Sequence, residues 1–263
     1  MPTATSLSQC LVQGTTTVID LTTPLSPSTP VVPVPAPFAP TAALSYTPVS
    51  DFDEAGPGWS WNDITLGEHA GTHVDAPRHW ISGRNGKSVD QISPDRLVGP
   101  AAVVDCTDQV SENPAYLLTI EDLEAWETEY GRFQPGTWVL ARTGWSERSA
   151  DPEKFLDPQG WPGLTLSAAK WLAGHPHVSG YGVEAIGIDS LGGSQEADDQ
   201  DPDPGAFGPG HYYLLGSDKY GVTSLRNLEQ LPAHGATIIV APLPLVGGTA
   251  APARVFALLE ESK

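Results

Sequence analysis

The residues best suited to chemistry in this 263-residue chain lie within one short segment, HAGTHVDAPRH, at residues 69–79. This segment holds three of the chain's seven histidines, His69, His73 and His79, together with Asp75. Imidazole nitrogens and a carboxylate oxygen are ligands that zinc, manganese and iron(II) accept from proteins. The segment therefore predicts a site for a divalent metal ion, and an incidental histidine-rich surface loop is the alternative.

The spacing of these residues limits the backbone that could join them on one ion. On a regular strand, His69 and His73 would lie about 13 Å apart, too far for two ligands at about 2.1 Å from one ion. A helix would bring the two histidines together, but Gly71 and Pro77 disfavour a helix there. We therefore expect a bend at Gly71 and the residue after it, which folds His69 back toward His73 and Asp75.

The same residues suggest a division of roles. Three protein ligands, His69, His73 and Asp75, would leave positions on the ion open for water or substrate, as catalytic metal sites do. His79 would then remain as a nearby imidazole that carries protons.

The pattern His-x-Gly-Thr-His-x-Asp-x-Pro-x-His, complete in residues 69–79, resembles the signature of the metal-dependent cyclase superfamily. That superfamily includes bacterial kynurenine formamidases and isatin hydrolases, and the longer run at residues 56–86 looks most like the isatin hydrolase branch. The resemblance implies an α/β chain with the swivelling β/β/α cyclase-like fold and a mixed sheet, as a single domain over residues 1–263. It also implies a homodimer or higher homo-oligomer and one divalent ion, with Mn²⁺ ahead of Zn²⁺.

A second segment, which begins at His211, resembles the other site segment of the same superfamily. In the two-metal formamidases a glutamate follows this histidine by twelve residues, but the matching position here is Thr223, followed by Ser224. A hydroxyl brings no charge to offset a second dication, so the resemblance implies a single ion. His211, Thr223 and Ser224 are then expected to contact the substrate, and a buried core histidine is the alternative for His211.

Tryptophans flank the proposed metal site on both sides. Trp59 and Trp61 precede it and share one face if the chain is extended there, and Trp80 follows it directly. Tryptophans are commonly core residues. Their clustering around a polar segment nevertheless predicts a flat aromatic pocket for a small cyclic substrate.

Together these features predict a metal-dependent hydrolase that opens a small aromatic or cyclic amide, such as isatin, at a carbon–nitrogen bond. The ion would polarise the carbonyl and activate water, and His79 would move the proton to the leaving nitrogen. The alternatives are an arylformamidase acting on N-formylkynurenine, a lactone or other cyclic amide hydrolase, and a non-catalytic protein that binds a metal or an aromatic ligand. The sequence has no Gly-x-Ser-x-Gly elbow and no Walker loop, which argues against a serine nucleophile and a nucleotide cofactor.

Composition excludes several classes of partner. The chain has 32 acidic and 13 basic residues, a formal charge of −19 that disfavours nucleic acid and anionic membranes as partners. We expect no transmembrane helix, because no run of 18 apolar residues occurs, and no signal peptide at the N-terminus. Only two cysteines, Cys10 and Cys106, are present, which fits a reducing compartment, and we expect a cytoplasmic protein.

The elements that must position these residues alternate between strand and helix, which favours an α/β fold. We expect strands at 17–22, 101–105, 137–143, 181–190 and 236–248, an edge strand at 253–260, and helices at 119–131 and 167–174. The strand at 236–248 should leave the sheet near Pro242. Thr119 should cap the first helix, with Asp122 three residues on and Gly131 at its end.

Two segments fit neither helix nor strand. The proline-rich stretch at about residues 23–40 is either a linker or, by the family resemblance, a substrate-site arm that crosses to a neighbouring subunit. The acidic loop at 191–210 is either a lid or a solvated surface loop, and its position directly before His211 favours a lid.

Overall fold

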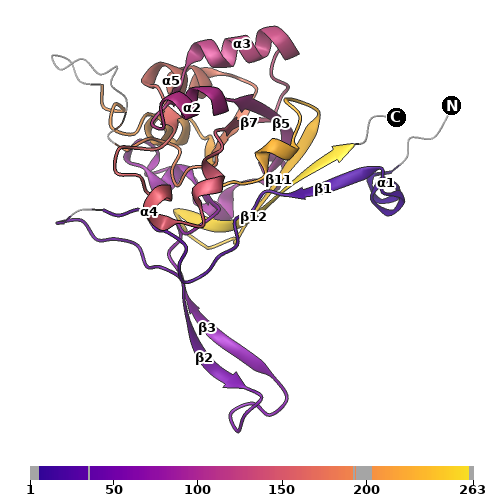
Figure 1. Ribbon diagram of the computed structural model, residues 1–263, viewed down its shortest axis with the longest axis vertical. Helices are drawn as coiled ribbons and strands as arrows, with labels where there is room; N and C mark the ends of the chain where they lie inside the picture. Colours follow the sequence, from indigo (N-terminus) through magenta and orange to yellow (C-terminus); the bar gives the residue numbers. More distant parts are fainter. Residues whose placement is uncertain (1–5, 35, 192, 194–202, 261–263) are drawn as a thin grey trace.

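The computed structural model describes residues 6–34, 36–191, 193 and 203–260, and its centre is one mixed sheet. The strands of this sheet are β1 (Thr16–Asp20), β4 (His73–Asp75), β5 (Val98–Asp105), β7 (Thr137–Arg142), β9 (Val178–Val183), β10 (Tyr220–Thr223), β11 (Ala236–Pro242) and β12 (Ala250–Glu260). Their order is β1-β12-β11-β5-β7-β9-β10-β4, and β4 also pairs with β12. Seven strands therefore close into a barrel-like ring, and β1 is attached to its outside (Figure 1).

Strand direction decides where a site can form. Strands β5, β7, β9 and β10 run parallel, so their carboxyl ends meet at one edge of the sheet. Strand β4 runs antiparallel to β10, which places His73 opposite Thr223 at that same edge. In α/β sheets, ligand sites usually lie outside the carboxyl ends of the strands.

The two faces of the sheet pack against different partners. On β7, Trp138 and Leu140 belong to the core inside the ring, whereas Val139 and Ala141 belong to a second core under the helices. This alternation follows from the two-residue period of a strand. The helices that cover the second core are α2 (Thr107–Glu112), α3 (Ile120–Tyr130) and α5 (Leu166–Gly174), which gather on one side in Figure 1.

The remaining elements are short. They are α1 (Leu7–Gln13), α4 (Pro152–Phe155), the paired strands β6 (Leu117–Leu118) and β8 (Gly163–Leu164), the 3-10 turns Pro77–His79, Ile81–Gly83, Val89–Gln91, Pro94–Arg96, Trp145–Arg148 and Leu228–Gln230, and the π-helical turn Gly210–Leu215. Among the described residues, no helix combines the length and apolar character needed to cross a bilayer.

Most of the expected elements are confirmed. Helix α3 has the expected capping box, in which Thr119 and Asp122 exchange side-chain and backbone hydrogen bonds, and it ends at Gly131. Strand β11 ends at Pro242, as expected. The central sheet contains both parallel and antiparallel pairs, as the predicted α/β fold with a mixed sheet requires.

Two expected strands differ from the structure. The strand expected at 181–190 is β9, which ends at Val183, because the chain then turns away from the sheet at Glu184. The segment at 253–260 is not an edge strand, since β12 pairs with β1, β11 and β4. The prediction was wrong because the alternating small and aliphatic residues of β12 are compatible with a central strand as well as with an edge strand.

A long hairpin, β2 (Ser45–Asp51) and β3 (Ser60–Thr65), projects away from the ring (Figure 1). Trp59 and Trp61 lie toward its far end, with ring centroids 6.0 Å apart and about half of each residue exposed. Within one chain, the hairpin therefore carries these two tryptophans away from the ring, and they do not join Trp80 in an aromatic pocket. Their predicted contact with substrate requires a neighbouring subunit.

The proline-rich stretch and the acidic loop are the two segments for which no helix or strand was expected. The first part of the proline-rich stretch lies against the ring, where Thr23 N donates to Thr72 Oγ1 at 2.9 Å and Thr23 Oγ1 donates to the Ser224 carbonyl at 3.0 Å. In the acidic loop, residues 192 and 194–202 lie outside the described residues. The lid therefore stays a prediction.

Candidate metal centre

Gly71 makes the bend on which the site depends. Its φ of +60° lies in the left-handed region, which disfavours residues with a side chain. A Cβ at this position would lie 2.4 Å from Leu25 Cδ2 of the proline-rich stretch. The bend folds His69 back, so that its Nδ1 lies 3.0 Å from Asp75 Oδ1. The expected change of direction is confirmed.

Asp75 Oδ1 is the point on which the expected ligands converge. His69 Nδ1 lies 3.0 Å away and His73 Nε2 lies 3.4 Å away. Two ligand atoms bound at about 2.1 Å with angles of 90–109° would be about 3.0–3.4 Å apart. Asp75 is only 1% exposed, and its Oδ1 has no hydrogen-bond partner among the described residues.

The partners of the two histidines determine which nitrogen of each neutral ring carries the proton. His73 Nδ1 donates to the Gly71 carbonyl at 2.8 Å, so Nε2 keeps its lone pair. His69 Nε2 lies 3.3 Å from Thr249 Oγ1, and the Thr249 hydroxyl gives its single proton to Glu68 Oε2 at 2.6 Å. Thr249 must therefore accept from His69 Nε2, which leaves the lone pair on His69 Nδ1.

With these tautomers, the anionic Asp75 Oδ1 faces two imidazole lone pairs instead of two N–H donors. A shared cation removes the resulting repulsion, so His69, His73 and Asp75 fit a divalent metal ion. Burial raises the pKa of Asp75, but in the metal-free protein positive charge on His73 and hydrogen bonds from His73 and His69 outweigh it and hold this pKa well below its usual value; a bound cation would take the place of those protons. The carboxylate is therefore ionised and ready to bind a metal.

His79 lies beside the same cluster. Its ring centroid is 4.0 Å from that of His69, and ligand atoms of His69, Asp75 and His79 all lie within 4.8 Å of one another. His79 could therefore replace His73 as a ligand, and its predicted role in proton transfer remains to be tested. Burial lowers the pKa of His79 to about 3, although Asp75 opposes this shift. The imidazole is therefore neutral at neutral pH and keeps a lone pair.

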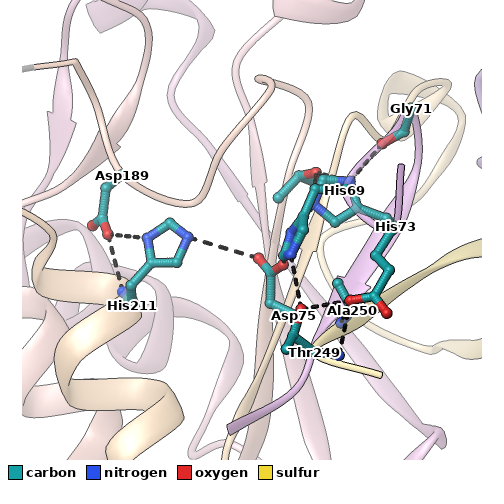
Figure 2. A network of polar contacts seen from close by, with 10 residues as sticks. His69, Gly71, His73, Asp75, Asp189, His211, Thr249 and Ala250 are labelled. Atoms are coloured by element: carbon teal, nitrogen blue, oxygen red, sulfur yellow. Dashed lines mark hydrogen bonds and ion pairs between the residues drawn. The ribbon is translucent and has the colours of Figure 1, made fainter. Parts of the chain in front are cut away.

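A carboxylate–histidine pair approaches the cluster from the other side (Figure 2). His211, in the π-helical turn, lies 2.6 Å through Nδ1 from Asp189 Oδ2 and 3.8 Å through Nε2 from Asp75 Oδ2. Asp189 also accepts hydrogen bonds from the backbone N–H groups of Gly210 and His211. Burial lowers the pKa of His211, but Asp189 and Asp75 outweigh it and raise the pKa. Asp189 thus orients the ring and favours its protonated form.

Among the three tryptophans, Trp80 lies at this cluster. Its ring centroid is 4.6 Å from that of His211, with an interplanar angle of 31°, and 5.7 Å from that of His79. This half-buried indole offers a flat apolar surface next to the polar groups.

Thr223 and Ser224 lie behind the candidate metal ligands. Thr223 is fully buried, and its hydroxyl lies 3.1 Å from His73 Nδ1. The Ser224 carbonyl accepts a hydrogen bond from Thr72 Oγ1 at 2.6 Å. These positions support an orienting role for Thr223 and a role for Ser224 in holding the Gly71 bend, and the expected contact of both residues with substrate stays a prediction.

Three residues of the site were missed by the sequence analysis. For Asp189 the sequence did hold a clue, because this residue lies near the end of the strand expected at 181–190, and site residues are common at strand ends. Nothing in the sequence indicated that Glu68 and Thr249 are in contact, since 181 residues separate them in the chain.

We expect Thr249→Val to weaken metal binding about 10- to 100-fold, because the hydroxyl fixes the ring orientation and tautomer of His69. A chelator competition titration measures this affinity. Thr17→Val, on the exposed side of β1, is the matched control. An unchanged affinity in Thr249→Val would show that the Glu68–Thr249 pair does not support the site.

The fold and the His/Asp cluster define a family. The family model for putative cyclases matches residues 19–190, and the chain belongs to this family. Within it, the isatin hydrolase of Roseibium aggregatum is 37% identical over 259 residues, covering 96% of this chain and 95% of that protein. The kynurenine formamidase of Salinibacter ruber is 28% identical and covers 90% of this chain and 95% of that protein.

Solved structures agree with the sequence comparison. Isatin hydrolase A from Ralstonia solanacearum matches with a TM-score of 0.89 at 42% identity, covering 99% of this chain and 100% of that chain. An isatin hydrolase bound to the product analogue thioisatinate matches with a TM-score of 0.88 at 37% identity, covering 97% and 96%. The cyclase-like fold expected from the resemblance is confirmed.

Proposed function

We propose that this protein is a metal-dependent hydrolase that opens the cyclic amide of isatin to give isatinate. The observation that carries the proposal is the buried Asp75 Oδ1, on which the lone pairs of His69 and His73 converge. The similarity to isatin hydrolases over almost the whole chain supports the choice of substrate.

The geometry assigns a task to each group around the substrate. A divalent ion held by His69, His73 and Asp75 would supply Lewis-acid chemistry, polarising a carbonyl oxygen and lowering the pKa of water. His79, which is neutral at neutral pH, accepts the proton of the attacking water and returns it to the leaving nitrogen as the carbon–nitrogen bond breaks. His211, held by Asp189, donates a hydrogen bond from Nε2 to a substrate oxygen.

A comparison of substrates tests the choice of isatin. Isatin, N-formylkynurenine and a simple lactone are assayed side by side on protein supplied with Mn²⁺ or Zn²⁺. We expect kcat/KM for isatin to exceed the other two values by at least about 10-fold, because the aromatic surface of Trp80 suits a flat bicyclic ring. Preference for N-formylkynurenine would instead support the formamidase alternative. The similarity to kynurenine formamidases is the reason for including this substrate.

We expect about one tightly held ion per chain, with Mn²⁺ ahead of Zn²⁺. Two dications a few ångströms apart repel strongly and need bridging carboxylates to coexist. Thr223, where the formamidases have a glutamate, supplies none and instead contacts His73. Elemental analysis after dialysis measures the ratio, and a value near two per chain would overturn the single-ion proposal.

We further propose a cytoplasmic homodimer or higher homo-oligomer that binds no nucleic acid or membrane. The exposed tryptophans of the β2–β3 hairpin support the assembly, since Trp59 and Trp61 can approach a metal centre only across a subunit boundary.

A further inference from the structure

A second depression lies at the edge of the sheet opposite the metal centre. It has a volume of about 490 Å³, and its lining includes Arg96, Gly136, Val178 and Lys219. These residues precede or begin the parallel strands β5, β7, β9 and β10, so they mark the amino ends of those strands. The metal centre lies beyond the carboxyl ends, and the two sites are therefore separate.

Lys219 is a buried cation that has no counter-ion within the part of the chain that the structure describes. It is 6% exposed, and its Nζ donates to the carbonyl oxygens of His175 at 2.6 Å and Val178 at 2.7 Å. An ammonium has three N–H donors, so one has no acceptor among the described residues. Both acceptors are neutral, and no described carboxylate lies within ion-pair distance of Lys219. Buried charges normally have an ionic partner.

Arg96 is a second cation at the same depression, and it too forms no ion pair with a described residue. Its guanidinium stacks over the Tyr220 ring at 5.2 Å, and its Nη2 donates to the Asp218 carbonyl at 3.1 Å. Its Nε is buried and has no hydrogen-bond partner among the described residues. No described carboxylate forms an ion pair with the guanidinium. Burial, with repulsion from Arg96 in addition, lowers the pKa of Lys219 to about 8.

The carboxylates of the depression are engaged elsewhere. Asp218 accepts a hydrogen bond from Lys87 Nζ at 2.6 Å, and Asp95 accepts one from the Ser93 hydroxyl. Neither forms an ion pair with Arg96 or Lys219, although, after the hydrogen bond from Ser93, the charge of Arg96 contributes to lowering the pKa of the exposed Asp95. The chain has only 13 basic residues and a formal charge of −19. Two cations that line one depression and form no ion pair with any described carboxylate are therefore unexpected.

We propose that this depression binds a small oxyanion between Arg96 and Lys219. The planar guanidinium matches the oxygens of a carboxylate or a phosphate, and the buried ammonium adds a point charge. An anion placed there pairs both cations, removes their mutual repulsion and supplies an acceptor for the third N–H of Lys219. The site is independent of the hydrolytic centre.

Calorimetric titration of metal-loaded protein at pH 7 and constant ionic strength tests the proposal. The probes are inorganic phosphate and acetate, which separate a phosphate ligand from a carboxylate ligand. We expect saturable binding of at least one probe to the wild type, weakened at least 10-fold by Arg96→Gln and by Lys219→Met. Lys154→Gln, which removes an exposed charge on α4, is the control and should bind as the wild type does.

Arg96→Gln decides the test if Lys219→Met does not fold, because Arg96 is only partly buried. An anion held at the metal centre would survive Arg96→Gln, so this variant separates the two sites. Binding that is equal in Arg96→Gln and Lys154→Gln, or no saturable binding of either probe to the wild type, overturns the proposal.

Discussion

Asp75→Asn is expected to lose its metal and to hydrolyse isatin about 10³-fold or more slowly in kcat/KM. The asparagine keeps the size of the side chain but removes the charge on the oxygen where the two histidine lone pairs converge. Lewis-acid stabilisation by a metal is worth several kcal/mol, and each 1.36 kcal/mol is tenfold in rate. Elemental analysis and initial rates on the purified variant measure both effects.

Asp105→Asn is the matched control, because Asp105 is a carboxylate paired with Arg142 at a partly exposed position. It should keep wild-type metal content and activity. Circular dichroism of both variants checks the fold. Full metal content in Asp75→Asn would show that this carboxylate is not a ligand.

His79→Ala is expected to keep its metal but to lose about 10²- to 10⁴-fold in kcat, as for a lost general acid–base group. The neutral imidazole that accepts the proton is then missing, while His69, His73 and Asp75 remain. Added imidazole should restore part of the activity of this variant. His234→Ala, at an exposed histidine, is the control and should be unchanged.

Metal content decides between the two possible roles of His79. Its side chain lies close enough to His69 and Asp75 to complete a ligand set without His73. If metal content and activity fall together in His79→Ala, His79 is a ligand and the proton transfer belongs to another group, with His211 the nearest candidate.

The convergence of His69, His73 and Asp75 was the most predictable part of the site, because these residues are close in sequence and one backbone bend joins them. Pro77 and Gly71 excluded a helix, and the ligand spacing excluded a straight strand. A bend at Gly71 and the residue after it was therefore expected, and the structure makes this bend with Gly71 in the left-handed region. Local sequence predicts a site well when all of its residues lie in one short segment.

The residues that orient these ligands could not be predicted, because they come together only through the closed sheet. Thr249 reaches His69 since β12 begins beside β4, a pairing that the expected edge strand did not include. Asp189 reaches His211 because the chain turns out of the sheet after Val183. Strand patterns alone determine neither the β12–β4 pairing that closes the sheet nor the early end of β9.

The tryptophans show the opposite case, in which closeness in sequence was misleading. Trp59 and Trp61 lie within 10 residues of His69 in the sequence, yet the hairpin carries them away from the ring. Trp80, which directly follows the 3-10 turn Pro77–His79, lies beside His79 and His211. The direction of a hairpin depends on its packing partners, and these can belong to another subunit.

The most direct test of a metal-dependent isatin hydrolase is removal and return of the metal. Wild-type protein is stripped with a chelator, dialysed, and assayed for isatin ring opening before and after addition of one equivalent of Mn²⁺ or Zn²⁺ per chain. We expect the stripped protein to be inactive, and one equivalent to restore most of the activity in the wild type but not in Asp75→Asn. Full activity in stripped protein, with negligible metal by elemental analysis, would contradict the account.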